Sequence, residues 1–136
     1  MPTITRFEDI EAWKTARQLT NLINELTAQN KFSRDFGLKD QIRRAAVSVM
    51  SNIAEGFESQ TQAQIIRYLG VAKASSGEVR SQLYAALDTN YLTKEQFDIA
   101  FDLVDKASRQ LARFISYLET HPTAKCFREE SSQYEI

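Results

Sequence analysis

Apolar residues recur every three or four positions in four stretches of the chain, which is the spacing of one buried face on an α-helix. The first stretch runs from about Asp9 to about Gln29, with apolar positions at Ile10, Trp13, Ala16, Leu19, Leu22, Ile23 and Leu26. The second runs from about Leu38 to Glu55, with a stripe of Ile42, Ala46, Val49 and Ile53. Residues 30–37 between them contain turn formers, so we expect a loop in which Gly37 supplies a positive φ. Gly56 suits the position just after the end of the second helix.

The third stretch begins near Thr61, which together with Gln64 has the form of a capping box. Its apolar seam then repeats every four and three residues at Ile65, Leu69, Ala72, Ser76, Val79, Leu83 and Ala86. Gly70 and Gly77 lie within this helix, and each weakens it by about 1 kcal/mol relative to alanine. We therefore expect another helix to approach closely at both glycines.

The fourth stretch begins at Thr93, where Gln96 completes a second capping-box pattern, and His121–Pro122 stops it. Its apolar face consists of Phe97, Ala100, Phe101, Val104, Ala107, Leu111, Phe114, Ile115 and Leu118. Residues 123–136 are polar and show no pattern, so we expect a mobile tail.

No stretch shows the alternation of a β-strand, and short links between long helices favour antiparallel neighbours. The sequence therefore predicts an all-α protein, an antiparallel up-down-up-down four-helix bundle of residues 1–122. The length of 136 residues fits one domain. The sequence contains no run of about 18 apolar residues, so it predicts no membrane span. It also shows no apolar leader, so we expect a cytoplasmic protein.

A polar stripe lies beside the core stripe of the second helix. Arg44, Ser48, Asn52 and Glu55 follow one another at intervals of four, four and three residues. Buried polar groups must find hydrogen-bond partners, and Glu78 on the third helix is the candidate partner for Arg44. We expect this pair to be partly buried between the second and third helices and to fix their packing; the alternative is that the stripe lines a ligand pocket.

The net charge is −1, but residues 31–92 hold eight Lys or Arg against six Asp or Glu. A set of basic residues on the second and third helices could follow a phosphate backbone: Lys39, Arg43, Arg67, Lys73 and Arg80. On the fourth helix, Lys106, Arg109 and Arg113 form another basic stripe. There, Asp102 and Asp105 precede Lys106 and Arg109 by four residues, which favours a self-neutralised, solvated face.

The residues that usually carry catalysis are scarce. His121 is the single histidine, and we expect it to act as a cation near a helix C-terminus. Cys126 is the single cysteine, so there is no intramolecular disulfide. A di-metal site in a helical bundle needs a Glu-x-x-His motif, which this sequence lacks. We therefore expect no catalytic residue, no metal, no cofactor, no small-molecule substrate and no enzymatic activity.

The apolar stripes are wider than a four-helix core requires, because large side chains such as Trp13, Tyr68 and Phe101 add to them. Apolar surface left over in this way usually marks an interaction site. Identical subunits can bury it head to tail, which closes a ring when the rotation suits. We therefore expect a homo-oligomer.

Three segments of the second helix carry a resemblance to a known family. Residues 37–38, 41–48 and 51–56 read Gly-Leu, Gln-Ile-Arg-Arg-Ala-Ala-Val-Ser and Ser-Asn-Ile-Ala-Glu-Gly. They resemble the signature of small bacterial four-helix-bundle proteins encoded in 23S rRNA intervening sequences. Residues 7–13, 66–69, 75–79 and 90–92 extend the resemblance over about residues 7–119.

The family includes the accessory variability determinant of diversity-generating retroelements, which forms a homopentameric ring and binds nucleic acid and a reverse transcriptase. The resemblance therefore implies a ring-forming bundle without enzymatic activity, with five subunits preferred, and RNA, DNA or a reverse transcriptase as possible partners. The chain departs from the family pattern at Met50, where a proline is common. It also departs in residues 57–62, which carry no positive charge.

Overall fold

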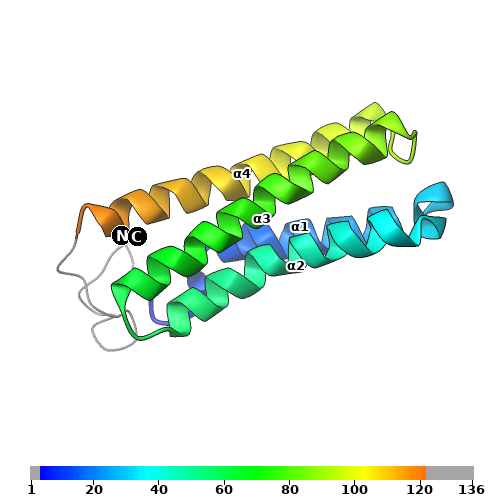
Figure 1. The fold of residues 1–136 in the computed structure, drawn as a ribbon. Helices are drawn as coiled ribbons and strands as arrows, with labels where there is room; N and C mark the ends of the chain where they lie inside the picture. The colour runs from blue at the N-terminus through cyan, green and yellow to red at the C-terminus, as the bar shows by residue number, and fades with distance from the viewer. Residues whose placement is uncertain (1–3, 122–136) are drawn as a thin grey trace.

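Four long helices form the protein (Figure 1), whose computed structural model describes residues 4–121. The helices are α1 (Glu11–Thr27), α2 (Phe36–Glu58), α3 (Gln62–Asp88) and α4 (Lys94–Glu119). Two 3-10 turns, η1 (Phe7–Asp9) and η2 (Asn30–Arg34), precede α1 and α2, and no strand occurs in the described part of the chain. The all-α prediction is confirmed.

The four helices lie side by side along the length of the molecule (Figure 1). Each helix packs against its neighbours in the chain, and α1 also packs against α4, which closes the bundle. The links α1–α2 and α3–α4 lie at one end, and the link α2–α3 lies at the other. This is the up-down-up-down arrangement that the short links predict.

The predicted apolar stripes form the core. Leu19 and Ile23 of α1, Ile42 and Ile53 of α2 and Leu83 of α3 are each no more than 1% exposed. The core consists of two clusters, one toward each end of the bundle. Trp13 and Tyr68 are half-buried at its edge, as is Phe101, so the large side chains of the widened stripes are covered in part by the subunit itself.

Side chains cap the starts of α3 and α4 as the sequence predicts. The Thr93 hydroxyl accepts a hydrogen bond from the Gln96 amide, and the Gln96 side chain accepts one from the Thr93 amide, which completes a capping box. At α3, the Thr61 hydroxyl accepts from the Gln64 amide. The Gln64 side chain turns instead to the amide of Gln60, so this cap is only half of a box.

The prediction for the start of α2 was wrong. Residues 30–34 form the 3-10 turn η2 rather than an irregular loop, and α2 begins at Phe36 behind the N-cap Asp35. Gly37 lies inside the first turn of α2, and the positive φ of this connection belongs to Asn30. Asparagine tolerates the left-handed region better than most residues do, so the turn does not need the glycine.

The roles expected of the other glycines were also wrong. Gly56 lies within α2, which continues to Glu58, and it is a site where α2 and α3 approach each other closely. A β-carbon built at Gly56 would lie 3.0 Å from Tyr68 Cβ. A β-carbon at Gly70 would meet nothing within 4 Å, and one at Gly77 would meet only the flexible end of Arg80. The close packing needs Gly56 and neither glycine of α3.

None of the described helices is long and apolar enough to cross a membrane. The predicted tail of residues 123–136, which includes Cys126, lies outside the described residues.

Candidate interaction surfaces

A polar seam joins α2 to α3 at the middle of the bundle. The hydroxyl groups of Ser48 and Ser75 share a hydrogen bond of 2.9 Å between the two helices. The Asn52 side chain donates to the Ser48 carbonyl at 2.8 Å and to its hydroxyl at 3.0 Å. Ser48 and Asn52 are partly buried, so their hydrogen bonds satisfy groups that would otherwise lose contact with water.

The ends of the predicted stripe do not belong to this seam. Arg44 and Glu55 are exposed, as is Glu78, and Arg44 does not pair with Glu78. Glu78 accepts a hydrogen bond from Gln82 of its own helix at 3.3 Å. The reason is geometric, because four residues turn an α-helix by about 400°. Arg44 is therefore rotated about 40° further from α3 than Ser48 is.

Arg43 makes the interhelical contact that the sequence assigned to Arg44, and it makes it with α1. Its Nε donates to the Thr27 hydroxyl at 2.7 Å, and a terminal nitrogen donates to the Asn24 carbonyl at 3.2 Å. That carbonyl belongs to the last turn of α1, where helix geometry leaves the carbonyl groups without partners. Arg43 thus caps the C-terminus of α1.

The five basic residues proposed for a phosphate backbone do not form one surface of the subunit. Arg43 is engaged with α1, whereas Arg80 points toward α4, where it lies 3.9 Å from Asp105. The guanidinium of Arg67 lies over the ring of Tyr68. Lys73 is exposed and Lys39 is partly buried. The spacing along each helix correctly puts Lys39 with Arg43, and Lys73 with Arg80, on one face of their helix. In the assembled bundle, however, the face of α2 and the face of α3 lie against different neighbouring helices.

The charges of α4 behave as predicted in part. Arg109 Nε lies 3.1 Å from Asp105 Oδ2, four residues earlier, so this part of the basic stripe is neutralised on its own helix. His121 lies at the end of α4, where the sequence placed it, and its Nδ1 donates to the Tyr117 carbonyl in the last turn of that helix. In the described part of the chain, no three His, Cys, Asp or Glu side chains come together as metal ligands.

Sequence reasoning missed the seam's partner on α3, Ser75, and a second buried polar residue of that helix, Gln82. Ser75, which bonds to Ser48, and Gln82 are both more than nine-tenths buried. They are seven residues apart, and this spacing keeps two side chains on one face of a helix. The same spacing defines the apolar seam, so Ser75 and Gln82 could have been recognised as a parallel polar row beside it.

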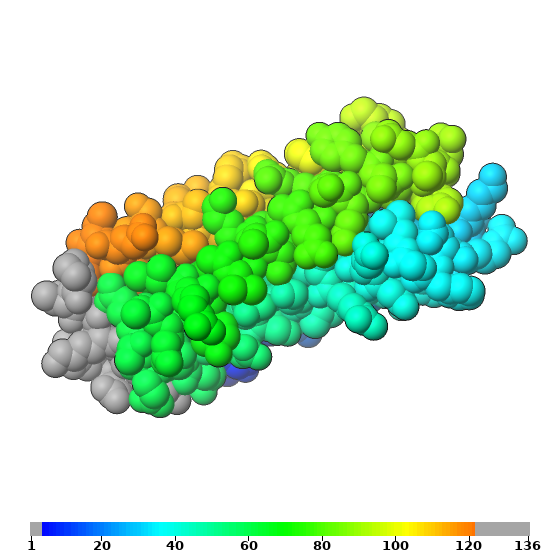
Figure 2. All heavy atoms as spheres, viewed as in Figure 1, coloured from blue at the N-terminus to red at the C-terminus, as the bar shows by residue number. Residues whose placement is uncertain are grey.

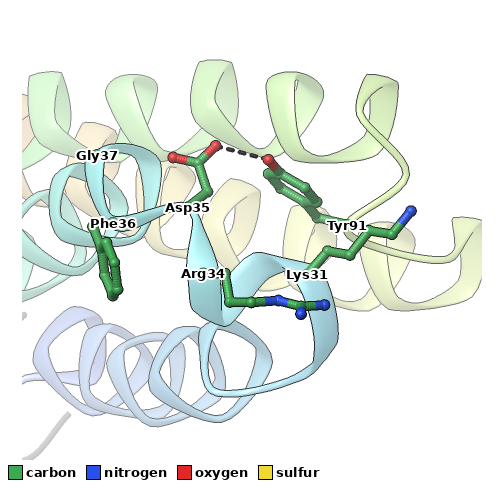
Figure 3. Close-up of a pocket in the computed structure, with 6 residues that line it drawn as sticks. All are labelled: Lys31, Arg34, Asp35, Phe36, Gly37 and Tyr91. Carbon is green, nitrogen blue, oxygen red and sulfur yellow. Dashed lines mark hydrogen bonds between the residues drawn. The ribbon is translucent and has the colours of Figure 1, made fainter.

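Sequence reasoning also missed a pocket where η2 meets α2, which we call the end pocket (Figure 3). It has a volume of about 620 Å³ and opens widely to solvent; its lining consists of Lys31, Arg34, Asp35, Phe36, Gly37 and Tyr91. The Tyr91 hydroxyl donates to Asp35 Oδ2 at 2.8 Å, and Asp35 Oδ1 accepts from the Leu38 amide at 3.1 Å. These bonds tie both links at this end of the bundle together.

The two hydrogen bonds that Asp35 accepts change the pKa values of Asp35 and Tyr91. The Leu38 amide and then the Tyr91 hydroxyl hold the pKa of Asp35 below its ordinary value. The hydrogen bond to Asp35 raises the pKa of Tyr91. A carboxyl group whose pKa is lower in the folded protein stabilises the fold above its unfolded pKa, and this stability is lost as the pH falls through the folded pKa. A tyrosine whose pKa is higher in the folded protein stabilises the fold below its unfolded pKa, and this stability is lost as the pH rises through the folded pKa.

We therefore expect the Tyr91→Phe variant to be less stable than wild type by a margin that depends on pH. The margin should be constant between about pH 5 and 9, and it should narrow below about pH 4 and above about pH 10. Urea unfolding of both proteins across this range measures it. A margin that stays the same from acid to alkaline pH would show that the Tyr91–Asp35 bond does not contribute.

Comparison with known proteins agrees with this architecture. The family model of the 23S rRNA-intervening sequence protein matches residues 8–113. The fold is similar to the crystal structure of a protein with unknown function from the S23 ribosomal protein family of Bacteroides thetaiotaomicron. The TM-score is 0.72, the identity is 22%, and the match covers 77% of this chain and 95% of that one. A search of curated proteins found no match. Because the family model spans most of the bundle, the chain belongs to the 23S rRNA-intervening sequence protein family.

Proposed function

We propose that this protein is a non-enzymatic, ring-forming homo-oligomeric scaffold or adaptor. The observation that supports this proposal is the outer face of α2 and α3, which lies toward the viewer in Figure 2. Four charged residues on this face make no ion pair with any described residue: Arg44, Glu55, Arg67 and Glu78. Between them lies Val71, an aliphatic side chain that is 44% exposed.

The charges on this face are balanced in a way that suits a second copy of the same chain. The Ser48–Ser75 bond and the Gly56–Tyr68 contact set the antiparallel register of α2 and α3. In this register Arg44 lies level with Glu78, and Glu55 lies level with Arg67. Each end of the face thus carries one positive and one negative charge, and complementary charges around an apolar centre favour specific association.

Five subunits are our preferred number, and that number rests on the family resemblance. A head-to-tail contact between identical subunits closes a ring when its rotation divides a full turn. In such a ring the α2–α3 face supplies one half of the contact and a different surface of the next subunit supplies the other; two α2–α3 faces that meet each other give a dimer, which is the fallback to the pentamer.

Light scattering coupled to size-exclusion chromatography tests the proposal. We expect wild type to have a mass five times the 15.6 kDa of one chain. Val71→Glu should lower that mass, because a carboxylate at the centre of the face would be desolvated without a partner. Ile99→Glu is the matched control, since Ile99 is 55% exposed on α4, outside the face. A wild-type mass of one chain, or equal masses for the two variants, would contradict the proposal.

A nucleic-acid-binding accessory function is the alternative, and the exposed Arg67 and Lys73 favour it because neither pairs with a described carboxylate. We expect any binding to single-stranded RNA to be weak and to fall steeply between 50 and 200 mM salt, because phosphate contacts release counterions. Fluorescence anisotropy with a labelled oligonucleotide measures this, and the Arg67→Ala/Lys73→Ala variant should flatten the salt dependence. Tight binding that persists at high salt would refute this account.

A further inference from the structure

The end pocket carries the most exposed large apolar side chain among the described residues. Phe36 is 70% exposed although it stands in the first turn of α2. The other aromatic residue of this connection, Phe32 of η2, is buried and stacks on Tyr91. Aromatic side chains are enriched where proteins bind one another, so the exposed Phe36 is a candidate contact for a binding partner.

Two cations line the same pocket as Phe36 without a counter-charge. Figure 3 shows Lys31 and Arg34 extending toward the same side of the pocket as Tyr91, with Phe36 on the other side of Asp35. Neither cation lies within ion-pair distance of a carboxylate of the described residues. Asp35, the acidic residue of the pocket, has both oxygens engaged by Leu38 and Tyr91.

The floor of the pocket is held in place by contacts that do not depend on a ligand. The ring centroids of Phe32 and Tyr91 are 5.2 Å apart, and the Tyr91 hydroxyl is bonded to Asp35, which caps α2. A site whose backbone is fixed before binding loses less entropy when a ligand arrives.

We propose that the end pocket binds a short acidic peptide segment of a partner protein. Two carboxylates of the segment pair with Lys31 and Arg34, and a neighbouring aromatic or aliphatic side chain covers Phe36. The arginine contributes most of the specificity, because a guanidinium can bind a carboxylate through two parallel hydrogen bonds. The proposal uses no residue of the α2–α3 face, so it holds or fails independently of the proposed oligomer.

A protein partner fits the pocket better than a nucleic acid does. A phosphate backbone presents a charge at every nucleotide, and proteins that bind it neutralise many of them. The pocket offers two cations and contains Asp35, within a chain of net charge −1. A peptide with two carboxylates and one apolar residue matches that number of charges and also uses the exposed ring.

Selection from a random dodecapeptide phage library on the purified full-length protein tests the proposal. We expect the selected sequences to combine two or more Asp or Glu with an adjacent Phe, Leu or Trp. A fluorescein-labelled peptide of the consensus sequence then reports affinity by anisotropy. Lys31→Ala/Arg34→Ala and Phe36→Ala should each weaken its binding by tenfold or more.

Two matched controls separate this pocket from general effects of charge and exposed apolar area. Lys106→Ala/Arg113→Ala removes two exposed cations of α4, and Ile99→Ala trims an exposed side chain there; both should bind the peptide as wild type does. Failure to select any sequence, a consensus without acidic residues, or unchanged affinity in the Lys31→Ala/Arg34→Ala variant would overturn the proposal. So would displacement of the peptide by a 12-nucleotide single-stranded RNA at lower concentration than by unlabelled peptide.

Discussion

The Gly56→Val variant is expected to be less stable than wild type by about 1–3 kcal/mol, the usual cost of overpacking a close contact. The first added carbon at Gly56 would lie 3.0 Å from Tyr68 Cβ and 3.5 Å from the Ile65 carbonyl oxygen. Both atoms are fixed by the α3 backbone, so α2 and α3 must separate to admit the valine. Urea unfolding followed by far-UV circular dichroism measures the change.

Gly70→Val is the control, because it makes the same substitution in a helix where an added β-carbon meets nothing within 4 Å. Valine has a slightly higher helix propensity than glycine, so this variant should match wild type within about 0.5 kcal/mol. Equal losses for both variants would mean that the close approach at Gly56 does not limit the packing of α2 on α3.

The contrast between these glycines shows what a single sequence can predict about this fold. Core residues of a helix can be recognised by their spacing of three or four positions. The stripes that contain Leu19, Val49 and Leu83 were therefore predicted correctly, and all three residues are buried. A glycine has no side chain to place in a pattern. Whether a glycine ends a helix, allows a turn or makes room for a neighbouring helix depends on what packs against it. For Gly56 the residue that packs against it is Tyr68, which belongs to a different helix.

The polar seam was predictable only at its centre for a related reason. Ser48 and Asn52 lie on the flank of α2 that meets α3, and their hydrogen bonds involve Ser75 and each other. Small rotations about the helix axis decide the rest, because Arg43 and Arg44 differ by about 100° around α2. A pattern of spacing tells which residues share a face, but the neighbour on each side is known only when the four helices are assembled.

The end pocket lay beyond sequence reasoning because its residues come from two links. Asp35 and Tyr91 are 56 positions apart and meet where η2 faces the α3–α4 connection. The turn formers of residues 30–37 indicated a connection without indicating its shape. The exposed Phe36 carried a signal that was overlooked, since an aromatic residue between Asp35 and Gly37 falls outside the apolar stripe of α2.

The Arg43→Met variant is expected to lose about 1.5–3 kcal/mol of stability, as is typical when hydrogen bonds to a charged group are removed. Methionine keeps much of the apolar stem but donates nothing to the Thr27 hydroxyl or to the Asn24 carbonyl. The carbonyl lies in the last turn of α1, where a positive charge also interacts favourably with the helix dipole. Unfolding in urea at pH 7 measures the loss.

Arg44→Met is the matched control, because Arg44 is exposed and should change stability by no more than about 0.5 kcal/mol. A double-mutant cycle with Thr27→Val then isolates the contact itself. Thr27 is completely buried and also donates to the Ile23 carbonyl at 2.7 Å, so its hydroxyl links Arg43 to the backbone of α1. Residues in direct contact couple by about 0.5 kcal/mol or more. A coupling near zero, or a larger loss for Arg44→Met than for Arg43→Met, would return the interhelical role to Arg44 and its predicted partner Glu78.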